Sequence, residues 1–300
     1  MMPKCIIFFA VVLSLPMAAA ADFQKTCDDA AGKRITIFTL HGDIKLRGYD
    51  GKNIEISSVK KGPDSDQVVI HDASFGNQIH IFPRYLDPAR SNATVDFEIR
   101  VPKEIFYNAA PDAKPKVGRI FNLYQRFSGD APPPPGASSA PPNKPPPPKM
   151  PPAGGVLQLP HAIYLKSNSG QITVSDVAGS MRLEGRNIEV RDVEGTLYAY
   201  STSGDIKGVL KQTSRRSVLQ FSSSSGSISV QAPDDIGAQV RIQSPAGQVK
   251  TDFPLETREM RYGSGKFIQG RLGAGTHMID MRSLSGAITF SKKSSETKDK

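Results

Sequence analysis

The stretches ITVSDVAGSMRL (172–183) and IEVRDVEGTLYA (188–199) repeat one phrase, I-x-V-x-D-V-x-G, at an offset of sixteen residues. This offset is too short for a strand, a helix and a second strand, and apolar residues alternate along each copy. Short strands joined by tight turns at this period are typical of stacked β-structures. The sequence therefore predicts an all-β fold, a parallel β-solenoid of short Gly-punctuated strands. Inward side chains should stack on their counterparts in the next coil, about 4.8 Å away: Ile172, Val174, Val177, Met181, Leu183, Ile188, Val190, Val193 and Leu197.

A second phrase is predicted to mark one corner of each coil. It consists of Gly, any residue and a β-branched residue, usually after a small residue. Glycine at such a corner can adopt a positive φ without a Cβ penalty. Copies on both sides of a proline-rich segment favour one interrupted solenoid over two separate domains. The copies are HGDI (41–44), SGQI (169–172), SGDI (203–206), SGSI (225–228), AGQV (246–249) and SGAI (285–288).

The segment 131–155 holds half of the chain's 24 prolines. Proline lacks a donor for a strand ladder and favours polyproline II, so this segment is expected to be a disordered linker or insertion outside the core. The expected order is a signal peptide (1–21), an N-terminal β region that starts and caps the solenoid (22–130), the proline-rich segment, the C-terminal solenoid repeats (156–291) and a polar basic tail (292–300).

Within the N-terminal β region, alternation between Arg34 and Val101 predicts six strands, followed by an exit strand over 101–108. A short amphipathic helix competes with strand over 118–127. The first strands and the tail after Phe290 are the candidate caps for the two ends of the solenoid.

Residues 1–21 have the pattern of a secretory signal peptide: Lys4, then the apolar run 5–15, then small residues up to Ala21. This pattern predicts export to the periplasm, the outer surface or the medium. No later stretch reaches the roughly 18 apolar residues of a membrane span. Once the signal peptide is removed with Cys5, Cys27 has no second cysteine with which to form an internal disulfide.

The phrase GDIKLRGYDGKNIEI (42–56), together with the S-G-x-I and D-V-x-G repeats, resembles a bacterial adhesin-like family of unknown function, DUF4097, related to the LiaG-like proteins. The resemblance covers most of the chain except the proline-rich segment, which departs from the family's compact pattern. It implies a parallel β-solenoid at the cell envelope with no established catalytic activity.

Asp176 and Asp192 occupy the same position in the two copies, so a regular solenoid places their carboxylates about one rung apart. They could share a cation such as Ca²⁺, or act as the stacked acids of a carbohydrate-active enzyme. The simpler interpretation is turn chemistry, because Asp before V-x-G suits a tight turn. Tyr198 and Tyr200 fall on the outer face of one strand, where they could bind a sugar or a protein partner, or pack across strands. No cofactor is expected.

The histidines and serines suggest no further site. His71 and His80 could face each other across a hairpin, but no Cys or carboxylate stands at metal-ligand spacing beside them. The run 222–225 lacks a nucleophile elbow and reads as polar outward and corner positions. Surface or cross-strand roles are expected for all the histidines: His41, His71, His80, His161 and His277.

The formal net charge of +9 suits weak attraction to anionic envelope polymers. Nucleic acid is not expected, because there is no Trp and no basic stripe interleaved with aromatic residues. The favoured function is a non-enzymatic binding or structural module of the envelope. Its partner would be an envelope polymer (acidic glycan or lipopolysaccharide) or an envelope protein. The alternatives are a carbohydrate-active enzyme on acidic polysaccharide and an envelope-stress protein with a protein partner. The sequence leaves the ligand and the oligomeric state open.

Overall fold

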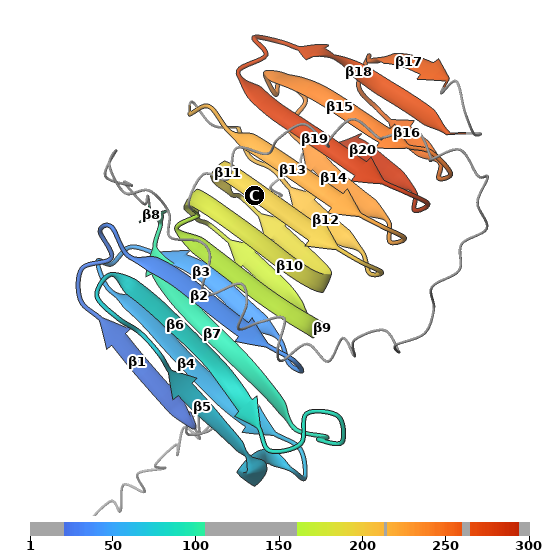
Figure 1. The fold of residues 1–300 in the computed structure, drawn as a ribbon. Coiled ribbons are helices and arrows are strands. Elements are labelled where there is room, and N and C mark those ends of the chain that lie inside the picture. Colours follow the sequence, from blue (N-terminus) through green and yellow to red (C-terminus); the bar gives the residue numbers. More distant parts are fainter. Residues whose placement is uncertain (1–20, 106–160, 213–214, 260–264, 294–300) are drawn as a thin grey trace, which may run out of the picture.

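A computed structural model describes residues 21–105, 161–212, 215–259 and 265–293. These residues form a 20-stranded sheet of mostly parallel strands and contain no α-helix (Figure 1). The predicted all-β parallel solenoid is confirmed. The strands are β1 (Phe23–Cys27), β2 (Arg34–Thr39), β3 (Ile44–Tyr49), β4 (Ile54–Lys61), β5 (Val68–Asp72), β6 (Gln78–Tyr85), β7 (Thr94–Pro102), β8 (Glu104–Ile105), β9 (Ile163–Ser175), β10 (Ala178–Arg191), β11 (Glu194–Ser201), β12 (Ile206–Val209), β13 (Val218–Ser223), β14 (Ile228–Ala232), β15 (Ala238–Ser244), β16 (Val249–Thr251), β17 (Glu256–Glu259), β18 (Lys266–Leu272), β19 (His277–Ser283) and β20 (Ile288–Lys292), with one 3-10 helix, η1 (Ser65–Gln67).

Each coil consists of two strand segments, and in six coils these meet at the predicted glycine-containing corner; β10 bends between Gly185 and Asn187, and residues 86–93 join β6 to β7. The first segments pair with one another in the spatial order β6, β2, β9, β10, β11, β13, β19 and β15, and β5, β18 and β17 extend this row. We call the outer side of this row the first-strand face. The second segments pair in the order β7, β3, β9, β10, β12, β14, β20 and β16, with β4 and β1 beyond β7, and their outer side is the second-strand face. In β9 and β10 the strand continues through the corner, so each contributes to both faces.

The core lies between the two rows and follows the predicted alternation. All nine residues predicted to point inward are at most 3% exposed. In the register of the sheet, Ile172 lies between Ile44 and Ile188, which confirms stacking of equivalent positions from coil to coil. The N-terminal coil of β2 and β3 pairs directly with β9, although 55 undescribed residues (106–160) separate the two segments of sequence. The described chain is thus one continuous solenoid.

Both ends of the solenoid use a strand order that the sequence did not reveal. At the C-terminal end, β19 and β20 lie between the coil of β13 and β14 and the coil of β15 and β16. The strand β20 therefore has a neighbour on each side, and most of the tail after Phe290 that was expected to cap this end lies outside the described residues. The antiparallel strands β17 and β18 terminate the row instead. At the N-terminal end, β6 and β7 lie inside the antiparallel strands β5 and β4 in the same way.

The corner glycines are needed for close approach, and only one of the six has a positive φ. Gly42 has φ +123°, and the other five do not fall in the left-handed region. A Cβ on Gly170 would lie 1.9 Å from the carbonyl oxygen of Gly42, and one on Gly226 would lie 1.8 Å from that of Gly204. The predicted positive φ is therefore wrong for five of the six glycines: a side chain is excluded because the backbone of the neighbouring coil occupies its place.

A buried serine precedes five of these glycines by three residues. The Ser223 Oγ accepts a hydrogen bond from the Gly226 N–H at 2.9 Å, and the Ser201 Oγ accepts one from the Gly204 N–H at 3.0 Å. Ser201 also donates to the Arg186 carbonyl of the neighbouring coil at 2.7 Å. The interpretation of the run 222–225 as outward and corner positions is therefore wrong for Ser223, which is 2% exposed. Buried backbone groups at each corner need such partners because water cannot reach them. The five serines are Ser167, Ser201, Ser223, Ser244 and Ser283.

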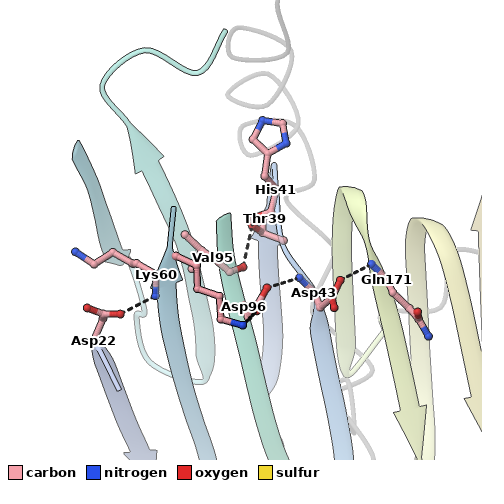
Figure 2. Close-up of polar contacts among 9 residues, drawn as sticks. Asp22, Thr39, His41, Asp43, Lys60, Val95, Asp96 and Gln171 are labelled. Carbon is pink, nitrogen blue, oxygen red and sulfur yellow. Dashed lines mark hydrogen bonds and ion pairs between the residues drawn. The ribbon is translucent and has the colours of Figure 1, made fainter. Parts of the chain in front are cut away.

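Exposed side chains also link neighbouring coils at these corners, because they accept hydrogen bonds from backbone N–H groups of the next coil. Figure 2 shows the N-terminal part of this ladder, where Asp96 accepts from the Asp43 N–H at 2.8 Å and Asp43 accepts from the Gln171 N–H at 2.9 Å. The pattern recurs where Asp205 accepts from the Ser227 N–H at 2.9 Å. Each side chain therefore holds the next coil in register.

Between Arg34 and Val101 the six predicted strands are present as β2 to β7. Several predictions concern residues outside the described part of the chain: most of the signal peptide, the exit strand beyond Ile105, the alternative helix, the proline-rich segment and most of the C-terminal tail. No helix in the described residues is both long and apolar enough to cross a membrane.

Candidate functional site

The first-strand face presents two adjacent rows of side chains that are set by the register of the sheet. Residues in one row come from consecutive strands, so neighbours lie about 4.8 Å apart. The first row runs through His80, Thr36, Tyr164, Arg182, Tyr198, Gln220, Asp280, Arg241, Gln269 and Glu256. The second row runs through Phe38, Lys166, Glu184, Tyr200, Ser222, Arg282, Gln243 and Phe267.

Charge separates the two faces of the solenoid. On the first-strand face, basic side chains outnumber the acidic ones Glu184, Glu194, Asp280 and Glu256, whereas the second-strand face carries the two signs in similar numbers. The basic side chains of the first-strand face are Arg34, Arg84, Lys166, Arg182, Arg241, Arg271 and Arg282. The second-strand face has Lys45, Lys61, Arg47, Arg100, Arg191, Lys207 and Lys250 against Glu55, Glu98, Glu189, Asp96, Asp205 and Asp252.

The central coils hold a cluster of aromatic and charged side chains on the first-strand face. Glu184 is its hub: the Arg182 Nη2 lies 2.6 Å from its carboxylate and the Lys166 Nζ 3.7 Å. The Tyr164 hydroxyl donates to Glu184 at 3.0 Å, and the Arg182 guanidinium lies 5.8 Å from the Tyr164 ring centre. Lys166 lies 6.0 Å from the ring centre of Phe38. These contacts fix the orientation of groups that a bound polymer would meet.

Tyr198 and Tyr200 point outward from β11, but they differ in exposure. Tyr200 is 43% exposed, and its hydroxyl lies 3.4 Å from the Ser224 Oγ. Tyr198 is half-buried, with its ring edge-on to His161 at 5.4 Å between ring centres. Burial, followed by the positive charges of Arg182 and Arg34, lowers the pKa of His161 to about 4. His161 is therefore neutral at physiological pH, and the Tyr198 ring packs against an uncharged imidazole.

Asp176 and Asp192 lie at equivalent corners of consecutive coils, one position beyond the paired residues Ser175 and Arg191. Both have left-handed backbone, with φ values of 58° and 51°. Aspartate tolerates this conformation better than most residues, and this supports the turn interpretation. Within the described chain no group of three or more His, Cys, Asp or Glu residues could hold a metal ion.

The histidines lie apart from one another. His71 is opposite Phe82 in the β5–β6 pair and stacks on it at 5.7 Å, while His80 contacts the same ring at 5.1 Å. The two histidines therefore do not face each other directly, because Phe82 lies between them. His277 is buried at 5% exposure.

The sequence reasoning missed the arginines of the first-strand face. Period-two alternation shows that Arg182 and Arg241 point outward, which was available from the sequence. Their alignment in one row depends on strand pairings between coils, which the sequence does not reveal.

Comparison with known proteins finds a family that the repeats resemble. Residues 161–291 match the model of the Toastrack DUF4097 family. No curated protein matches the chain. A solved structure of a candidate cell adhesion protein from Clostridium sporogenes is 9% identical, with a TM-score of 0.44, over 90% of this chain and 98% of that chain. That of a candidate adhesin from Bacteroides fragilis is 13% identical, with a TM-score of 0.27, over 90% and 96%. Residues 161–291, which hold the S-G-x-I and D-V-x-G repeats, are therefore similar to the Toastrack DUF4097 family.

Proposed function

We propose that this protein is an exported, non-enzymatic binding module of the bacterial cell envelope, and that its first-strand face holds an acidic glycan polymer. The observation that carries the proposal is the excess of basic side chains on this face, interleaved with Phe38, Tyr164, Tyr198 and Tyr200. Export rests on the signal-peptide pattern of residues 1–21.

The chemistry of the face suits such a polymer. Guanidinium and ammonium groups pair with carboxylates or phosphates, and aromatic rings stack on the apolar faces of sugars. A single exposed pair contributes little, so useful affinity requires many contacts made together. The solenoid supplies them as a rigid array whose strands repeat at about 4.8 Å.

The second candidate function is that of an enzyme that uses Asp176 and Asp192. Both residues occupy corners with left-handed backbone, where aspartate has a structural use. A hydrolase or lyase would release reducing or unsaturated ends from acidic polysaccharide, and such a release by the purified protein would favour the enzyme.

Co-sedimentation with insoluble acidic and neutral polysaccharide tests the proposal. The informative variant is Lys166→Gln with Arg182→Gln, and the matched control is Lys45→Gln with Lys207→Gln on the second-strand face. We expect wild type to bind the acidic polymer, with affinity that falls as salt rises. The first pair should weaken binding at least about tenfold, and the control by less than about twofold.

Equal losses in the two double variants would mean that net charge alone attracts the polymer. This result would overturn the assignment to the first-strand face. Crosslinking on intact envelope tests the alternative that the partner is a protein. If one protein is crosslinked and purified polysaccharide is not bound, a protein partner replaces the glycan in the proposal.

A further inference from the structure

An open hollow of about 530 Å³ lies at the C-terminal end of the first-strand face, over β15, β17, β18 and β19. Side chains from two adjacent rows surround it. One row contributes Met278, Gln239 and Arg271 from three neighbouring strands. The next contributes Asp280, Arg241, Gln269 and Glu256 from four. The volume falls within the range of small-ligand sites.

Arg241 is the cation of this hollow that remains available. Asp280 lies opposite Arg241 in the register, but Arg282 holds its carboxylate through two hydrogen bonds of 2.8 and 2.5 Å. The Arg241 guanidinium instead lies 5.4 Å from the ring centre of Phe267. No carboxylate of the described residues lies within ion-pair distance of it. A guanidinium on an aromatic face keeps its in-plane N–H donors, which suit a carboxylate.

The rest of the lining comprises a second guanidinium, on Arg271, a second carboxylate, on Glu256, which has a partner of its own, and neutral side chains. Arg271 donates to the Ala274 carbonyl at the edge of the hollow. Gln239 precedes Arg241 by two residues on β15, and Gln269 lies opposite Arg241 on β18; both offer amide donors and acceptors. Met278 is 44% exposed and provides an apolar contact. A guanidinium with no described carboxylate partner, planar amides and one apolar surface are suited to a sugar ring that bears a carboxylate.

We propose that this hollow binds a uronate unit of an acidic glycan. Arg241 holds the carboxylate, Gln239 and Gln269 bind ring hydroxyls, and Met278 packs against the C–H face of the sugar. This inference rests on the proposed function, since it names one unit of the polymer and where it is held. It lies several coils away from the cluster around Glu184, so the two can be tested separately.

The test is calorimetric titration of the purified protein with tetragalacturonate, and with neutral galactotetraose as the uncharged probe. We expect tetragalacturonate to bind and galactotetraose not to bind. Arg241→Gln should weaken binding at least about tenfold, because a charge-assisted pair is lost. Gln269→Leu should weaken it by a smaller factor. The matched control is Lys207→Gln on the second-strand face, which should change the affinity by less than about twofold.

Failure of the two proposals can be told apart. Polymer binding without tetragalacturonate binding would overturn the uronate site and leave the proposed function standing. Tetragalacturonate binding that Lys166→Gln with Arg182→Gln abolishes, and that Arg241→Gln leaves intact, would also overturn it. Equal thermal melting of wild type and Arg241→Gln shows that any loss of binding does not come from unfolding.

Discussion

Replacing Gly226 with alanine should destabilise the solenoid by about 3 kcal/mol or more. The new Cβ would lie 1.8 Å from the Gly204 carbonyl oxygen and 2.4 Å from its carbon. Ordinary contacts of this kind begin beyond about 3 Å, so β12 and β14 would have to separate by more than about 1 Å. That movement would stretch the Ile206 N–H to Ser227 carbonyl bond, which is 2.9 Å long. Overpacking and the loss of one or two backbone bonds each cost about 1–3 kcal/mol.

Urea unfolding followed by far-UV circular dichroism measures this loss, since the chain has no Trp for fluorescence. The matched control is Gly32→Ala, because Gly32 has φ +68° but no atom within 4 Å of the added Cβ. This control isolates the cost of a positive φ, about 1–2 kcal/mol. A Gly226→Ala variant no less stable than Gly32→Ala would refute the reasoning, because the coils could not then be in such close contact.

Three further predictions concern single side chains. Ser223→Ala should cost about 1–3 kcal/mol, since it leaves the Gly226 N–H without its partner, while outward Ser222→Ala should stay within about 0.5 kcal/mol by the same unfolding assay. Asp192→Asn should preserve the melting temperature and Asp192→Val should lower it, because Asn tolerates the left-handed backbone and Val does not. If Ca²⁺ raised the melting temperature of the wild type and Asp192→Asn removed this rise, the result would instead indicate a cation site. The pKa of His161 is about 4 in the folded chain and 6.5 as its ordinary value, so the unfolded chain takes up the proton first and stability falls as pH drops from about 6.5 to about 4. His161→Phe should flatten this decline by up to about 3 kcal/mol, and an unchanged slope between pH 7 and 4 would contradict the assignment.

The sequence was informative where the structure depends on local alternation. A side chain two positions along a strand returns to the same face, so Ile172, Val174 and Leu183 could be placed in the core without knowing which strands are neighbours. The same rule placed Tyr198 and Tyr200 outside. The same rule places Ser223 on the buried side with Leu219 and Phe221, although the polarity of serine favours an outward position. A buried hydroxyl is acceptable there because two coils supply its hydrogen-bond partners.

The amino-acid sequence alone determined the coil period and the inward positions, because these follow from repeats and from the two-residue alternation of a strand. Only the tertiary structure decided the order of the coils. In the structure, β19 and β20 lie between the coil of β13 and β14 and the coil of β15 and β16. The strands β2 and β3 pair with β9 across a long separation in sequence. Backbone hydrogen bonds between strands are nearly independent of side-chain identity, so the sequence does not specify which coil pairs with which. The row that contains Arg182 and Arg241, and with it the candidate binding face, exists only once those pairings are made.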